Sequence, residues 1–122
     1  MGRFLNETVG NMEYDELIIG NFPVADVTMV KLSASSGLVK RGTVLAGAPG
    51  GEFKPISEAA SANVALYILA DDAENMDEVQ MVTAYKSGKF NRMKLHTDGS
   101  YELTAADEEF LRLANIQVED AV

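Results

Sequence analysis

Several residue types with distinctive chemistry are absent or nearly absent from this chain. Its 122 residues include no cysteine, no tryptophan and a single histidine, His96. Without cysteine there can be no disulfide bond, no thiolate nucleophile and no cysteine-based zinc site. One histidine excludes a metal site built from several, and a lone histidine after a strand is more often a surface residue than a catalytic one.

Basic residues are also scarce. The chain has 10 lysines and arginines against 19 aspartates and glutamates, which gives a formal net charge of −9. Such a surface repels phosphate backbones, so we expect no direct binding to nucleic acid. It favours solubility and suits a protein that is displayed outward.

Long hydrophobic runs are missing as well. The longest, Val64 to Ala70, has the length of a strand and is too short to span a bilayer. Residues 1–8 lack the apolar stretch of a signal peptide. We therefore expect a soluble protein that is made in the cytoplasm and has no membrane partner.

The apolar residues that are present have the spacing of short strands. A chain of this length fits one domain with one modest core. Strands are expected at 17–19, 26–32, 38–45, 53–56, 64–70 and 116–118. The 64–70 run is apolar throughout, which predicts a core strand buried on both faces. Gly42 predicts a bulge or corner within the 38–45 segment.

The stretch from Val79 to Leu95 predicts a β-hairpin. Apolar and polar residues alternate on either side of residues 86–89, whose sequence Lys-Ser-Gly-Lys has the composition of a turn. Gly88 can take the positive φ that a tight turn requires. The basic residues of this stretch form either a solvated face or a patch that meets an acidic neighbour; they are Lys86, Lys89, Arg92 and Lys94.

One helix is expected, over residues 105–114. Thr104 and Asp107 have the spacing of a capping box, in which each side chain binds the other residue's backbone N–H. Phe110 and Leu113 then share one apolar face at helical spacing. The chain is therefore predicted to be mainly β, with a minor α component.

No motif for catalysis or cofactor binding is found. The chain lacks a Gly-x-Ser-x-Gly elbow, and the glycine-rich segment 47–51 lacks the Gly-Lys-Ser/Thr ending of a phosphate loop. The acidic segment Asp71 to Asp77 fails the calcium-loop test, because Met76 and Val82 stand where glycine and glutamate are required. We expect no enzyme activity, no metal and no cofactor, and we interpret the acidic segment as a solvated loop.

Three motifs follow one another between residues 38 and 95. They are an Arg-Gly-Thr-Val-Leu strand at 41–45, an apolar strand ending in Ile-Leu-Ala at 68–70, and Tyr-Lys-Ser-Gly-Lys-Phe at 85–90. In this order, with a helix and a final strand after them, they resemble the head decoration proteins of lambda-type tailed phages. The ordered set carries the resemblance, because each motif alone is weakly specific.

The resemblance implies a homotrimeric, non-enzymatic cement protein of the virion with a small β-clip-like barrel or sandwich. Such proteins bind the major capsid protein at local three-fold positions on the outer capsid surface and stabilise the expanded head. Residues 1–20 would be an extended capsid-docking arm, and residues 21–122 a single β-rich decoration domain. The apolar residues of this arm are the candidates for capsid contact: Phe4, Leu5, Tyr14, Leu17, Ile18 and Ile19.

Other interpretations stay open on the residues alone. The first 16 residues are either a loosely held terminus or an arm that orders on a partner. Folds of the β-clip kind also serve trimeric nucleotide hydrolases, although segment 117–122 lacks the motif set that closes their pocket. A ligand-binding β domain usually shows exposed tryptophan or tyrosine, whereas Tyr67 and Tyr85 lie in apolar strands and are expected in the core or at an interface.

Overall fold

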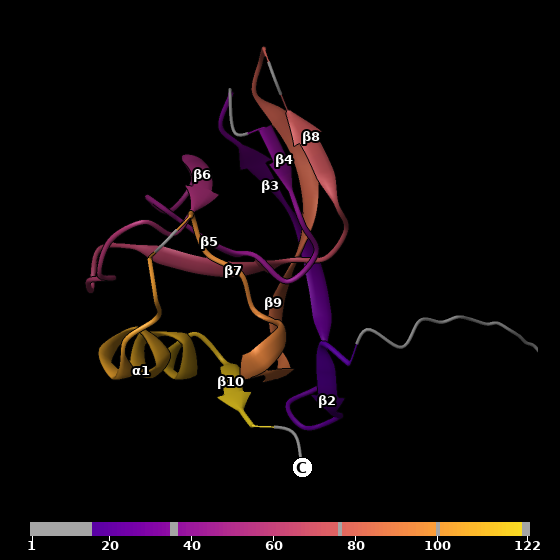
Figure 1. The fold of residues 1–122 in the computed structure, drawn as a ribbon, viewed down its shortest axis with the longest axis vertical. Coiled ribbons are helices and arrows are strands. Elements are labelled where there is room, and N and C mark those ends of the chain that lie inside the picture. Colours follow the sequence, from indigo (N-terminus) through magenta and orange to yellow (C-terminus); the bar gives the residue numbers. More distant parts are fainter. Residues whose placement is uncertain (1–15, 35–36, 76, 100, 121–122) are drawn as a thin grey trace, which may run out of the picture.

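Strands dominate the fold, as Figure 1 shows. The computed structural model describes residues 16–34, 37–75, 77–99 and 101–120. Its elements are, in chain order, β2 (Ile18–Gly20), β3 (Asp26–Leu32), β4 (Gly37–Val39), β5 (Val44–Gly47), β6 (Glu52–Pro55), β7 (Ala65–Leu69), β8 (Ala73–Asn75), β9 (Gln80–Asn91), the 3-10 turn η1 (Arg92–Lys94), α1 (Ala105–Leu113) and β10 (Ile116–Glu119). The predicted mainly β fold with one short helix near the C-terminus is confirmed.

Five of the strands close into a small barrel. Starting from β9, the order is β3, β6, β5 and β7, and β7 pairs back onto β9 through Ile68 with Tyr85 and Leu69 with Ala84. Closure pairs these strands on both sides and removes the free edges through which sheets aggregate. β2 and β10 extend the sheet below the barrel, on the two edges of the C-terminal half of β9.

The longest strand, β9, shows that the hairpin predicted over residues 79–95 is wrong. The chain continues as one strand through residues 86–89 because both of its edges are paired on either side of that segment. β3 and β7 pair with β9 as far as Ser87, and β2 and β10 pair with it from Gly88 onward, so a turn there would disrupt these ladders. Gly88 does take a positive φ of 146°, and a Cβ there would lie 2.9 Å from the ring of Phe90.

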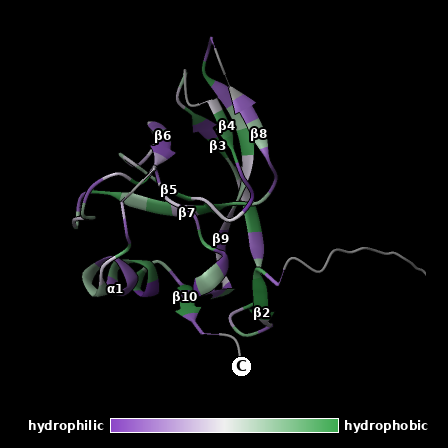
Figure 2. Ribbon diagram, viewed as in Figure 1, coloured by the Kyte–Doolittle hydropathy of each residue, from purple (hydrophilic) through white to green (hydrophobic). Residues whose placement is uncertain are grey.

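Hydrophobic residues pack into two clusters, one inside the barrel and one between the barrel and α1. The inner cluster consists of Val30, Leu32, Val39, Leu45, Phe53, Leu69, Val82 and Ala84. The outer cluster consists of Leu17, Val44, Ile56, Leu66, Ile68, Phe90, Leu111 and Ile116. β7 contributes to both clusters, which confirms the prediction of a strand buried on both faces; Figure 2 shows hydrophobic residues along β7 and β2.

β4 and β8 form a separate two-stranded arm at the top of Figure 1. The 38–45 segment is not one bent strand: it is divided at Gly42, since β4 pairs with β8 and β5 belongs to the barrel. Gly42 has a φ of 95°, and a Cβ there would lie 2.7 Å from the carbonyl oxygen of Lys94, so this corner requires glycine. The loop predicted at Asp71 to Asp77 likewise contains a strand, β8, although its acidic side chains are exposed where the structure describes them.

Helix α1 begins where the capping box predicts. The Thr104 hydroxyl oxygen accepts from the N–H of Asp107 at 3.1 Å, and the Asp107 carboxylate accepts from the N–H of Thr104 at 3.0 Å. Leu111 packs into the outer cluster, whereas Leu113 is 75% exposed. The chain then continues into β10, which confirms the predicted terminal strand. No helix in the described part of the chain is long and apolar enough to cross a membrane.

Candidate functional surfaces

The candidate docking residues fall into two groups. Three of them lie outside the described residues: Phe4, Leu5 and Tyr14. Leu17 is 1% exposed, packs in the outer cluster, and accepts a hydrogen bond from the N–H of Asn91 at 2.8 Å through its carbonyl oxygen. Ile18 is 36% exposed and Ile19 is half-buried. β2 is therefore joined to β9, and Leu17 serves as its anchor in the core rather than as exposed contact surface.

Two lysines of β9 have carboxylate neighbours within the chain. The amino group of Lys86 lies 3.6 Å from a carboxylate oxygen of Asp26, and that of Lys89 lies 3.8 Å from Glu119. Exposed pairs of this kind contribute little stability, because water screens them. Their presence supports the interpretation of these lysines as a solvated face.

Arg92 connects three elements of the fold. Two of its N–H groups donate to the Glu108 carboxylate, each at 2.8 Å, and a third donates to Asp120 at 2.6 Å. These hydrogen bonds, the one to Glu108 foremost, raise the pKa of Arg92 above its ordinary value. The guanidinium thus holds η1 against α1 and against the residue that follows β10.

Asp107 is a fully buried carboxylate with protein donors on both oxygens. It accepts from the N–H of Ala60 at 2.8 Å, from the N–H of Thr104 at 3.0 Å and from the hydroxyl of Tyr101. Burial alone would raise the pKa of Asp107, but these hydrogen bonds outweigh it and hold the pKa below its ordinary value. The hydrogen bond to Asp107, aided by burial, raises the pKa of Tyr101 to about 12. The carboxylate therefore secures the 57–63 loop to α1.

Across the ranges that the structure describes, no group of three or more His, Cys, Asp or Glu side chains is placed to hold a metal ion. The side chain of His96 is exposed, in agreement with the prediction of a surface histidine. Its backbone donates to Gly42 at 3.0 Å and accepts from Val44 at 2.9 Å, which joins the corner at Gly42 to the start of β5.

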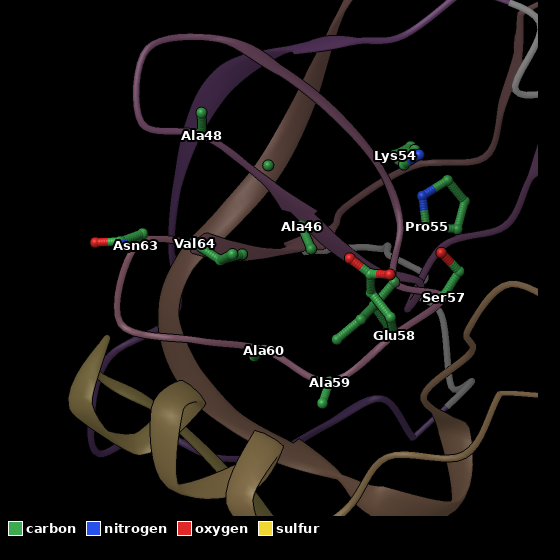
Figure 3. A pocket seen from close by; sticks show the side chains of 12 residues that line it. Ala46, Ala48, Lys54, Pro55, Ser57, Glu58, Ala59, Ala60, Asn63 and Val64 are labelled. Carbon is green, nitrogen blue, oxygen red and sulfur yellow. The ribbon is translucent and has the colours of Figure 1, made fainter.

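One hollow of about 270 Å³ lies between the β5–β6 hairpin and the 57–63 loop. Figure 3 shows that alanines from both sides form much of its lining, with Pro55 and Val64 beside them. Its charged members are Lys54 and Glu58. Small side chains of this kind offer a shallow contact surface.

A second hollow, of about 390 Å³, lies between the C-terminal part of α1 and β7; we call it the α1–β7 hollow. Tyr67 and Phe110 supply aromatic surface to it, and Leu113 supplies aliphatic surface. Among the described residues that line it, Lys86 is the one that carries a charge. A largely apolar concavity with a few polar groups is suited to an apolar side chain of a partner.

The outer face of the β3–β9 pair carries exposed apolar side chains. Val27, Met29, Val79 and Met81 are between 40% and 53% exposed. Elsewhere on the outside of the barrel, α1 and β10 cover the apolar residues of β5 and β7. An uncovered apolar face on an otherwise covered sheet is typical of a surface that meets another protein.

The connection between β2 and β3 projects two further apolar side chains. Phe22 is 81% exposed and Val24 is 67% exposed. The hydroxyl of Ser87 donates to the carbonyl oxygen of Val24 at 2.8 Å and so fixes this connection beside β9. Together with Pro23, these residues form what we call the 22–24 corner.

These exposed apolar surfaces were not predicted from the sequence. A signal was present in β3, where Val27 and Met29 alternate with Val30 and Leu32, so that both faces of the strand are apolar. A strand with two apolar faces needs a cover on each face, and at β3 the domain covers only one face. The surplus face was therefore detectable as a possible interface.

The comparisons with known proteins agree with the resemblance seen in the sequence. A family model described as Bacteriophage lambda head decoration protein D matches residues 8–118, which is nearly the whole chain. The matched range contains the closed barrel, helix α1 and most of β10. No curated protein matches the chain.

Proposed function

Because the chain belongs to the bacteriophage lambda head decoration protein D family, we propose that it is a non-enzymatic structural protein of the phage head. It binds as a homotrimer to the outer capsid surface at local three-fold positions and stabilises the expanded head. Its partner is the major capsid protein, and it is made in the cytoplasm of the bacterial host. The family match over residues 8–118 is the observation that carries this proposal.

The surface chemistry supports outward display. The net charge of −9 repels the phosphates of the packaged DNA and keeps the free protein soluble. The exposed apolar residues on β3, β9 and the 22–24 corner supply contact area for protein partners. In keeping with the family, we assign the barrel to the β-clip type.

We place the capsid contact in the N-terminal segment. Its apolar residues, with Ile18 and Ile19 after them, would lie along the shell, and an extended segment can add a strand to an exposed sheet edge. Leu17, which directly precedes β2, is buried, and its carbonyl oxygen accepts a hydrogen bond from the N–H of Asn91, so a load on the segment passes to β9. The arms of one trimer bind the shell at the same time, so weak single contacts combine into high avidity and raise the free-energy cost of separating capsid subunits.

A substitution that leaves the folded core intact tests this contact. The triple variant Phe4→Ser, Leu5→Ser, Tyr14→Ser keeps the length of the segment and spares Leu17. The matched control replaces polar residues of the same segment: Asn6→Ser, Thr8→Ser and Asn11→Ser. We expect the triple variant to lower occupancy on expanded capsids at least about tenfold, with an unchanged melting temperature, and the control to decorate like wild type. Wild-type occupancy of the triple variant would overturn this placement of the contact.

A further inference from the structure

The chain that leads into β2 is anchored in the core at Leu17. The Leu17 side chain is 1% exposed and packs in the outer cluster. One of its methyl groups lies beside the corner at Gly42, 3.3 Å from the position that a Cβ on Gly42 would take. Its carbonyl oxygen accepts the 2.8 Å hydrogen bond from the N–H of Asn91. Both the side chain and the backbone of Leu17 therefore have defined positions.

The neighbours of this anchor are themselves held in place. Asn91 is 3% exposed, and its side-chain oxygen accepts from the N–H of Met93 at 3.0 Å. At the corner, the N–H of Gly42 donates to the carbonyl oxygen of Leu69 at 2.9 Å, and its carbonyl oxygen accepts from the N–H of His96 at 3.0 Å. The anchor cannot shift without disturbing these hydrogen bonds, so the N-terminal segment joins the barrel at a fixed point.

The residue just before the anchor has an unusual backbone conformation. Glu16 has a φ of 58°, in the left-handed region that residues with a Cβ rarely adopt. Among the non-glycine residues that the structure describes, Asn115 is the other one with a positive φ, at 74°. Asn115 directly follows the end of α1, a position where asparagine is found in this conformation, and its N–H donates to Arg112 at 3.0 Å. Glutamate has no such preference, so the conformation of Glu16 calls for another reason.

The φ angle of Glu16 determines the direction of the segment before it. Glu16 is exposed, so burial of its side chain does not select the conformation. Because Leu17 is fixed, a rotation about the N–Cα bond of Glu16 moves only the preceding residues. A change from 58° to the value of about −65° that proline imposes would turn that segment by roughly 120°. Residues held in disfavoured conformations cluster at functional sites, where the geometry serves the function.

We propose that Glu16 is a positioning residue for capsid binding: its left-handed backbone sets the direction in which residues 1–15 leave the barrel, and the capsid contact depends on that direction. The inference rests on the proposed function, which places the contact in this segment. A segment that starts in a set direction loses less conformational entropy when it docks. A set direction also lets the segments of one trimer reach their sites at the same time, as avidity requires.

The carboxylate of Glu16 offers a competing explanation, because an exposed charge can contact the shell directly. Substitutions separate the backbone from the charge at this position. Asparagine removes the charge and tolerates the left-handed conformation, whereas valine removes the same charge and opposes the conformation through its branched Cβ. Proline excludes the conformation, because its ring fixes φ near −65°. Glu16→Asn is therefore the matched control for Glu16→Val and Glu16→Pro.

Capsid binding by these three full-length variants tests the proposal. Each is titrated onto expanded, undecorated capsids, and its melting temperature is measured without capsids. We expect Glu16→Asn to bind within about twofold of wild type, whereas Glu16→Val and Glu16→Pro should need at least about tenfold more protein for half occupancy. All three should melt like wild type, since Leu17 and the barrel after it are unchanged.

A distance between two labels reports the direction without capsids. The chain has no cysteine, so Glu13→Cys and Met93→Cys provide two sites for spin labels. Glu13 lies three residues before Glu16, and Met93 is 78% exposed on η1. We expect the distance between the labels to change when Glu16→Pro is added and to stay the same when Glu16→Asn is added. An unchanged distance in the proline variant would overturn the proposal.

The binding outcomes separate this inference from the function on which it rests. If wild type binds the shells and the valine and proline variants bind equally well, the role of Glu16 is overturned and the proposed function stands. An asparagine variant that loses as much as the valine variant also overturns it, because the carboxylate is then the determinant. Lower melting temperatures of the valine and proline variants overturn it too, since Glu16 would then support the barrel. A wild type that does not bind overturns both.

Discussion

The buried carboxylate of Asp107 accepts a hydrogen bond from the backbone N–H of Ala60 at 2.8 Å. This contact joins the 57–63 loop to the first turn of α1. The loop supplies Ser61 to the lining of the α1–β7 hollow, and α1 supplies Phe110. One side chain therefore fixes the start of the helix and the course of the loop, and with them the shape of that hollow.

Removal of this carboxylate should destabilise the domain. Asp107→Ala leaves the N–H groups of Ala60 and Thr104 without their acceptor inside the protein, so we expect the free energy of unfolding to fall by about 3 kcal/mol. Urea unfolding followed by circular dichroism measures the change. Glu109→Ala is the control, because the Glu109 side chain is 65% exposed on the same helix and its loss should cost less than about 0.5 kcal/mol. Equal effects of the two substitutions would contradict the assigned role.

The Asp107 carboxylate should also make the stability of the fold depend on pH in the acidic range. Its pKa is lower in the folded chain than in the unfolded chain, so its contribution is present above the ordinary aspartate pKa of about 3.9 and is lost as the pH falls through the folded value. Asp107→Asn should be less stable than wild type at neutral pH, and the difference should narrow below about pH 4. A difference that is constant with pH, measured by urea unfolding, would exclude the mechanism.

Tyr101 should make the stability of the fold depend on pH in the alkaline range. Its pKa is raised to about 12 in the folded chain, above the ordinary tyrosine value of about 10. Its contribution is therefore complete below about pH 10 and is lost as the pH rises toward about 12. Comparison of wild type with Tyr101→Phe over this range isolates the effect, because phenylalanine does not ionise. Parallel stability curves for the two proteins would show that Tyr101 does not titrate as described.

A charge in β7 should unfold the barrel. Leu66 is 4% exposed in the outer cluster, so Leu66→Asp places a carboxylate where it has no partner and removes apolar packing as well. We expect no cooperative thermal transition for this variant at neutral pH. Met93→Asp, at a position that is 78% exposed, should melt like wild type. A normal transition for Leu66→Asp would show that β7 is not a core strand.

Arg92 should contribute modestly to the stability of the fold, and this contribution should depend on salt. Its side chain is 38% exposed, so water screens its bonds to Glu108 and Asp120, and we expect Arg92→Met to cost about 1 kcal/mol at low salt. The cost should shrink as salt is added. Arg112→Met breaks an exposed pair with Glu109 and should cost less than about 0.5 kcal/mol. Urea unfolding at two salt concentrations measures both changes. An equal loss of unfolding free energy for the two variants would contradict the role assigned to Arg92.

Features set by neighbouring residues were predictable from the sequence. The capping box depends only on Thr104 and Asp107, which lie within one helical turn, and the structure places it as expected. The core position of β7 followed from a run without polar residues, since such a run has no face to turn to water. The end of that run, residues 68–70, was also one of the three motifs that carried the resemblance to the decoration proteins.

Features set by distant residues were not predictable in this way. Residues 86–89 have the composition of a turn, yet four strands from other parts of the chain hold them extended. The α1–β7 hollow combines residues near Val64 with residues near Phe110, so no local sequence pattern predicts it. Leu17 looked like part of a free arm, and only its pairing beside Asn91 revealed it as a core residue.

The most direct test of the proposed function is co-sedimentation of the purified wild-type protein with expanded, undecorated capsids of its phage. We expect the protein to sediment with the shells and to saturate at one trimer for each local three-fold position, with density on the outer surface in electron micrographs. Capsids that expand and sediment without bound protein, at protein concentrations well above the number of sites, would contradict the assignment as a head decoration protein.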